Sequence, residues 1–145
     1  MISVRVFNTH PQHRISSRGT LLVARSVFRS EDIRSALVNI IFINDTRMIR
    51  LNGTFLSKWR RTDVLSFPLN TAGENIEGEV YVDIDQARRQ ARDYNVTYKN
   101  EYSRLIIHGL LHLIGYRDNT IRLRKNMARR EDSILLGIVN HQYVL

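Results

Sequence analysis

Residues 97–118 read TYKNEYSRLIIHGLLHLIGYRD and begin with the longest apolar helix that the sequence predicts. Positions i and i+4 of a helix lie on the same face, so His108 and His112 can direct both imidazoles at one point. Gly115 lets the backbone leave the helix in a crowded or left-handed conformation, and the chain can then bring Asp118 toward the same point. Two imidazoles and a carboxylate are a ligand set for a catalytic zinc, with a fourth position left for water.

Two other interpretations of this motif stay open. Histidines on an apolar helix can be packed core residues, although a pair at this spacing followed by Gly and Asp favours a metal site. The spacing His-x3-His-x2-Gly-x2-Asp also matches the metzincin proteases, except that Gly109 stands where those enzymes have the Glu that acts as general base. A small zinc metalloprotease-like hydrolase is therefore an alternative that Gly109 weakens.

The flanking sequence predicts an α+β fold, a small mixed sheet of about four strands packed by helices, with the metal-binding helix in a cleft. Alternating apolar residues indicate half-buried strands, and a dense β-branched run indicates a strand buried on both faces. We expect residues 1–145 to form a single catalytic domain. The expected strands are 2–7, 37–43, 64–67 and 79–84, and a turn-rich stretch covers 70–78. The expected helices are 20–29, one capped by Asn44 or Asp45, a polar one capped by Asp85 that runs to about 94, 97–114 and 120–136.

Composition restricts the possible ligands. The chain of 145 residues has no cysteine, which excludes disulfides and thiolate metal sites. Its net charge of +8 comes entirely from residues 1–62, which carry 11 Lys and Arg against 3 Asp and Glu, whereas residues 63–145 carry 11 of each. Because 19 of the 22 cations are Arg, whose planar fork suits phosphate, nucleic acid is a plausible partner; a solvated basic surface is the alternative.

No part of the sequence suggests a membrane protein. No apolar run approaches the ~18 residues of a membrane span, and the N-terminus lacks the continuous apolar stretch of a signal peptide. We therefore expect a cytoplasmic protein that does not associate with a membrane.

Four segments occur in a specific order and spacing: LN at 51–52, TDVLSFP at 62–68, GEVYV at 78–82 and HGLLHLIGY at 108–116. Together they resemble the bacterial YbeY-type endoribonucleases, the rRNA maturation factors. The resemblance implies a metal-dependent, single-strand-specific endoribonuclease that acts in 16S rRNA 3′-end maturation and ribosome quality control. It implies as partners a single-stranded rRNA precursor and ribosomal small-subunit proteins, and it leaves the oligomeric state open.

The same resemblance implies one zinc ion per chain at His108, His112 and Asp118, which are then both the metal-binding and the catalytic residues. Two departures from the family pattern matter. The family usually has His where this chain has Asp118, and an aspartate oxygen also binds zinc well. The family commonly has Arg where this chain has Leu56, so that phosphate contact is lost unless a nearby cation replaces it.

The candidate substrate-binding residues precede and enter the 64–67 strand. Lys58, Arg60 and Arg61 can neutralise phosphates, and Trp59 among them can stack on an unpaired base; an exposed, solvated loop is the alternative. Ser66 is a further candidate for a hydrogen bond to substrate from a strand edge.

The remaining polar candidates are weaker. Asp63 is either a base or a partner that orients Arg61. His10, His13 and His141 have no partner spacing, so we expect them to be structural. A non-catalytic RNA-binding ribosome assembly factor with a structural metal is the remaining alternative.

Overall fold

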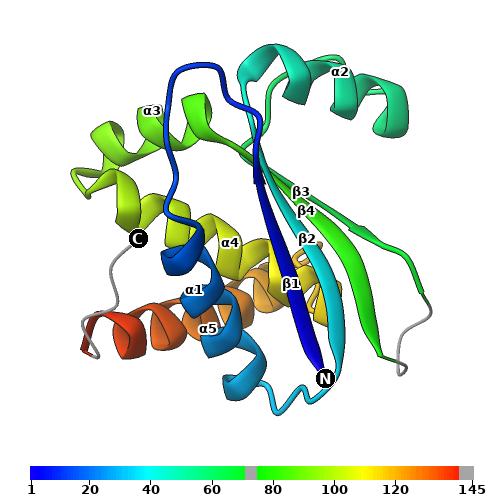
Figure 1. Ribbon diagram of the computed structural model, residues 1–145, viewed down its shortest axis with the longest axis vertical. Helices are drawn as coiled ribbons and strands as arrows, with labels where there is room; N and C mark the ends of the chain where they lie inside the picture. The colour runs from blue at the N-terminus through cyan, green and yellow to red at the C-terminus, as the bar shows by residue number, and fades with distance from the viewer. Residues whose placement is uncertain (71–74, 141–145) are drawn as a thin grey trace.

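The fold is built around the strand that the β-branched run predicts. The computed structural model describes residues 1–70 and 75–140, and within them four strands form one sheet in the order β1-β2-β4-β3 (Figure 1). β1, β2 and β4 are parallel, and β3 pairs antiparallel with β4 at one edge. The elements are β1 (Ile2–Asn8), α1 (Ser17–Ser30), β2 (Ala36–Ile43), α2 (Asp45–Leu56), β3 (Val64–Pro68), β4 (Ile76–Asp83), α3 (Ile84–Tyr94), α4 (Tyr98–Ile114) and α5 (Ile121–Asn140).

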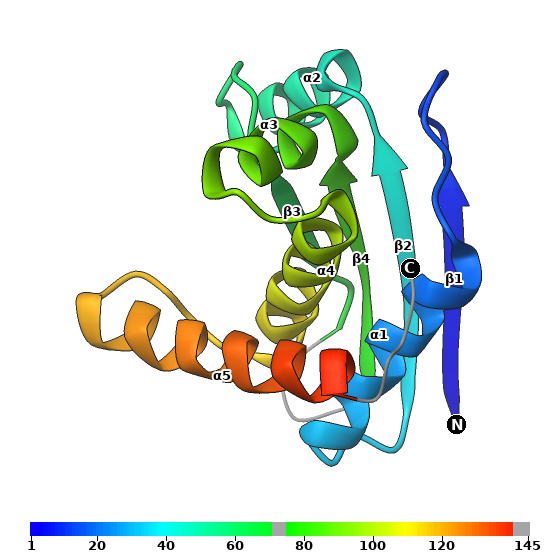
Figure 2. The ribbon, with the colours of Figure 1, turned by 90° about the vertical axis from the view of Figure 1, so that its left-hand side faces the viewer.

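The helices lie mainly on one face of the sheet. α1 and α4 pack directly on it, and α5 packs against both of them (Figure 2). In β2 the side chains of Val38, Ile40 and Phe42 point into this layer and are fully buried. α2 and α3 lie at the end toward which β1, β2 and β4 point, so the loops that leave these three strands meet there (Figure 2).

The predicted α+β architecture is confirmed, with shifts at several element ends. α1 begins three residues earlier than expected because Ser16 Oγ accepts a hydrogen bond from Gly19 N and caps the helix. The N-cap of α3 is Asp83, which accepts from the backbone N–H groups of Asp85 and Gln86, and not Asp85 as expected. β2 is buried on both faces only in its second half, since Leu37 is half exposed.

Other differences concern the ends of longer elements. β4 begins at Ile76, inside the stretch expected to be turn-rich, and residues 71–74 of that stretch lie outside the described residues. α5 continues to Asn140, four residues beyond the expected end. Within residues 1–70 and 75–140, none of the helices has the length and apolar character needed to cross a membrane.

Candidate metal centre

The placement of α4 on the sheet decides which way its two histidines point. Gly109 faces the sheet so closely that an added Cβ would lie 2.5 Å from Val80 Cγ1 and 3.1 Å from Val64 Cγ2. His108 precedes Gly109 and His112 follows it by three residues, so at about 100° per residue both lie on the same flank of α4, beside the face that meets the sheet, where both stay half-buried. The position that carries the general base in metzincin proteases has no room here for a glutamate side chain.

Three ligand atoms converge beside α4. His108 Nε2 and His112 Nε2 are 3.1 Å apart, and Asp118 Oδ2 lies 3.3 Å from His112 Nε2 and 3.8 Å from His108 Nε2. Ligands about 2.05 Å from a tetrahedral zinc would be about 3.3 Å from one another. The donor set therefore fits a metal ion with little movement, and the Asp118 side chain is 44% exposed, so the centre opens toward solvent.

The outer nitrogen of each histidine is held by an acceptor. His108 Nδ1 donates to Glu131 Oε1 at 2.8 Å, and His112 Nδ1 donates to the backbone carbonyl of Tyr116 at 3.0 Å. A carboxylate and a carbonyl can only accept, so both imidazoles carry their proton on Nδ1. Both Nε2 lone pairs consequently point at the same place, which is the arrangement found behind metal-binding histidines.

A glycine turn brings Asp118 back to the histidines. Gly115 has a φ of 120°, a conformation that side chains disfavour, and it ends α4. Its N–H donates to the carbonyls of Leu111 and His112, and Tyr116 N donates to that of Leu111. These bonds reverse the chain within one turn, as expected from the sequence.

The electrostatic field at this place favours positive charge. Burial lowers the pKa of His108, but the hydrogen bond and charge of Glu131, with the charges of Asp63 and Asp118, outweigh it and raise the pKa above its ordinary value. The same carboxylates would favour a cation between the two Nε2 atoms.

Glu131 is the residue of this candidate site that the sequence interpretation missed. It lies on α5, and its side chain is almost fully buried. It occupies a position between Met127 and Ile134 on the apolar side of the helix. A charged residue in the apolar stripe of an amphipathic helix was the signal, because such a side chain needs a buried partner.

The basic loop, residues 58–62, lies beside α2 and close to the candidate metal centre. The Trp59 ring rests against the α2 backbone at Gly53, and Asn52 Nδ2 donates to the carbonyl of Arg60. Arg60 and Arg61 line a cavity of about 510 Å³ together with Thr62, Asp63, Gln86 and Gln90. Asp63 lines this cavity, and the next residue, Val64, packs against α4 at Gly109, beside His108, so the basic loop and the centre are neighbours.

The structure shows where three of the candidate residues lie. Asp63 does not orient Arg61: the Arg61 guanidinium lies 3.7 Å from Asp45 Oδ2, and Asp63 Oδ1 accepts from Val64 N. The Ser66 side chain faces α4, and its hydroxyl donates to the carbonyl of Gly109 at 2.8 Å. Lys58 is exposed and lies outside the residues that line the cavity.

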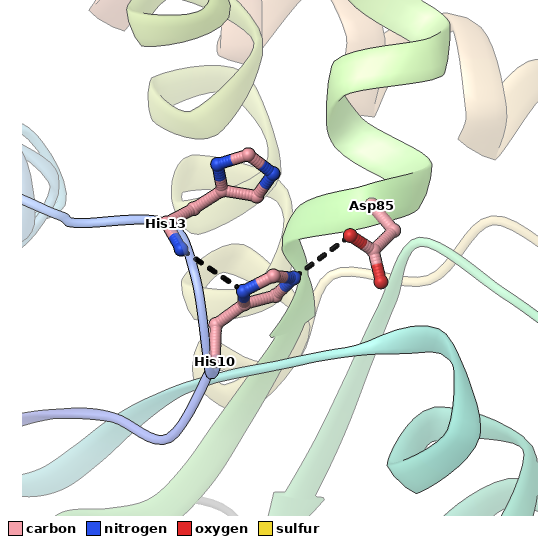
Figure 3. Close-up of side chains that lie close together, drawn as sticks. All are labelled: His10, His13 and Asp85. Atoms are coloured by element: carbon pink, nitrogen blue, oxygen red, sulfur yellow. Dashed lines mark hydrogen bonds and ion pairs between the residues drawn. The ribbon is translucent and has the colours of Figure 1, made fainter.

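A second group of histidines lies where β1 ends. His10 Nε2 is 2.8 Å from Asp85 Oδ1, and the His10 and His13 rings are 4.6 Å apart (Figure 3). His10 Nδ1 accepts from the backbone N–H groups of Gln12 and His13, so the proton is on Nε2 and is donated to Asp85. The pair therefore anchors the loop to α3. His10, His13 and Asp85 also form a group whose ligand atoms lie close enough together to hold a metal ion, so the structural role expected of His10 and His13 stays a prediction. His141 lies outside the described residues.

The fold and the site together define a class: a small α+β protein that can hold a metal ion between two histidines and an aspartate. Residues 8–138 match the family model described as Endoribonuclease YbeY. The chain belongs to this family.

Similar proteins agree with this assignment. The chain is 31% identical to the endoribonuclease YbeY of Salinibacter ruber, covering 90% of this chain and 88% of that protein. It is 33% identical to the endoribonuclease YbeY of Chlorobaculum parvum, covering 95% and 99%. The solution structure of TM1509 from Thermotoga maritima is similar with a TM-score of 0.66 and 25% identity, over 97% of this chain and 94% of that one.

Proposed function

We propose that residues 1–145 act as one catalytic domain, a metal-dependent endoribonuclease that cuts single-stranded RNA in 16S rRNA 3′-end maturation and ribosome quality control. The observation that carries the proposal is the convergence of His108 Nε2, His112 Nε2 and Asp118 Oδ2 next to a basic loop. The relatives named above are endoribonucleases by name. The cytoplasm, an rRNA precursor and ribosomal small-subunit proteins are the location and partners that this function requires.

One zinc ion per chain would be held by His108, His112 and Asp118. When bound, zinc supplies Lewis acidity, which polarises a phosphoryl oxygen and lowers the pKa of water to ~7. The protein fixes the orientation of the two imidazoles: Glu131 accepts from Nδ1 of His108, and the Tyr116 carbonyl accepts from Nδ1 of His112. The exposed side of Asp118 is where the RNA strand approaches.

The basic loop would bind the RNA strand. Arg60 and Arg61 line the cavity that adjoins the centre, and their guanidinium groups suit phosphate oxygens. Lys58 adds charge at the exposed end of the loop. Trp59 is 67% exposed and can stack on an unpaired base. In a duplex the base faces are already stacked on one another. This gives a physical reason for preference for unpaired RNA. Ser66 supports the centre from behind by joining β3 to α4 at Gly109.

The two alternatives have less support. A metalloprotease-like hydrolase needs a general base at the position of Gly109, where the sheet leaves no space for one. A structural metal in a non-catalytic assembly factor usually has four protein ligands. The group formed by His108, His112 and Asp118 consists of three side chains and faces solvent, so a fourth position is left open.

The decisive experiment compares metal content and RNA cleavage in the wild type, His112→Ala and His13→Ala. The last variant is the matched control, since it removes a histidine outside the centre. We expect one zinc per chain and cleavage of unpaired but not duplex RNA in the wild type and the control, and neither metal nor cleavage in His112→Ala. A wild type without metal, or one that hydrolyses peptides and not RNA, would refute the proposal. Equal cleavage by His112→Ala would identify a contaminating nuclease.

A further inference from the structure

A second cavity lies at the opposite end of α4 from the metal centre. It has a volume of about 410 Å³ and lies between α1, α3 and α4. From Lys99 in its wall to His108 the helix rises about 14 Å. None of the residues that line this cavity belongs to the metal centre or the basic loop. They are Arg14, Ile15, Ser16, Thr20, Arg88, Thr97, Tyr98, Lys99 and Tyr102.

The lining combines an apolar floor with cations and has no acidic side chain. Ile15, Tyr98 and Tyr102 supply the apolar surface, and Arg88 lies over the Tyr98 ring at 3.8 Å from its centroid. In the part of the chain that the structure describes, Arg14, Arg88 and Lys99 are not among the cations paired with a carboxylate. Three unpaired positive charges around one cavity favour an anionic ligand.

One neighbouring carboxylate offsets only part of this charge. Asp85, at the adjacent start of α3, is turned away from the three cations, since Oδ1 accepts from His10 Nε2 and Oδ2 accepts from Asp45 N. Three cations against one carboxylate leave the cavity positive. The same bond from His10 ties the loop that carries Arg14 to α3 (Figure 3). The cavity is therefore held in place before any ligand arrives, which lowers the entropy cost of binding.

We propose that this cavity binds a nucleoside monophosphate group, with the phosphate between Arg14, Arg88 and Lys99 and the base on the Tyr98 and Tyr102 side. A free phosphate would use the cations alone, whereas a mononucleotide uses the cations and the apolar floor together. The volume lies within the roughly 300–1,000 Å³ of small-ligand sites. The group can belong to a free mononucleotide or to the phosphorylated end of an RNA chain, since both present the same chemistry.

Equilibrium titrations with AMP and adenosine test the proposal on the wild type, Arg88→Gln, Lys99→Gln and Arg92→Gln. Arg92 is the matched control, because it is exposed on the same helix as Arg88 and does not line the cavity. We expect AMP to bind saturably, and adenosine at least tenfold more weakly. Each of the first two variants should weaken AMP binding about tenfold, since a charge-assisted hydrogen bond is lost. Arg92→Gln should stay within twofold.

Two of the variants, Lys99→Gln and the additional His112→Ala, make the outcome unambiguous. Lys99 is exposed, so Lys99→Gln tests the charge without disturbing the Arg88 and Tyr98 contact. His112→Ala should bind AMP as the wild type does, which separates this site from the metal centre and from the fate of the proposed RNA cleavage. Equal binding of AMP and adenosine, equal loss in Arg88→Gln and Arg92→Gln, or loss of binding in His112→Ala would overturn the proposal.

The source of the group follows from a third titration. A dinucleotide with a 5′-phosphate that binds more tightly than AMP, and more tightly than its 5′-hydroxyl form, would assign the cavity to an RNA end. AMP binding without dinucleotide binding would assign it to the free nucleotide.

Discussion

Replacing Gly109 by alanine tests how closely α4 must lie on the sheet. The added Cβ would be 2.5 Å from Val80 Cγ1, whereas carbon atoms in contact are about 3.5–4.0 Å apart, so the two must separate by about 1 Å. Val80 is fully buried between neighbouring strands and cannot turn away freely. Overpacking of this kind costs about 1–3 kcal/mol, and alanine recovers about 1 kcal/mol in helix propensity.

The balance is a loss of at most about 2 kcal/mol, and because the clash is with a fully buried side chain we expect Gly109→Ala to lower the free energy of unfolding by close to that amount, measured by urea unfolding followed by circular dichroism. Because α4 carries both histidines, its displacement should also weaken metal binding. Gly137→Ala is the matched control: it is also in a helix, and its added Cβ would meet nothing within 4 Å. It should gain up to about 1 kcal/mol.

The two glycine variants should thus differ in sign. A Gly109→Ala protein as stable as the wild type, or stabilised like Gly137→Ala, would refute the conclusion that contact with the sheet selects glycine at this position.

Three other substitutions test separate parts of the structure. Glu131→Gln removes the charge that holds His108 and should lower metal affinity about 10–100-fold, measured by competition with a chelator. Asp132→Asn, a control exposed on the same helix, should leave the affinity unchanged. Equal affinities of the two variants would contradict the conclusion that Glu131 positions His108. Burial and a neighbouring aspartate raise the pKa of Asp83 from 3.8 to about 8. The folded state therefore keeps a proton that the unfolded chain releases, and stability should fall with rising pH over this interval by up to about 1.4 kcal/mol per pH unit. Asp83→Asn should remove this difference in urea unfolding, and parallel pH curves would disprove it. The double variant of Arg60→Gln and Arg61→Gln should reduce the slope of log RNA affinity against log salt by about 1.4 with metal content unchanged, and an unchanged slope would separate these cations from RNA binding.

Hydrophobic patterns and capping residues together predicted every helix and strand of the described chain, because each is a local property of consecutive residues. The i,i+4 histidines and the glycine turn likewise belong to one continuous stretch, so their grouping with Asp118 was predictable. The errors at element ends have local causes too: at α3 two aspartates compete for the cap, and only Asp83 is placed to accept from both free N–H groups.

What the sequence determined by itself was the fold class, the family and the grouping of two histidines and an aspartate at the end of α4. The tertiary structure decided which residues stand behind that set. Glu131 meets His108 only because α5 packs across α4, 23 residues later in the chain, and Ser66 meets Gly109 only because β3 pairs at the edge of the sheet. It also placed Arg61 against Asp45 and gathered three cations around the cavity at the start of α4. Such contacts depend on how the helices and strands pack. Packing brings together residues that are far apart in the sequence and follow no regular spacing, so a sequence pattern does not reveal them.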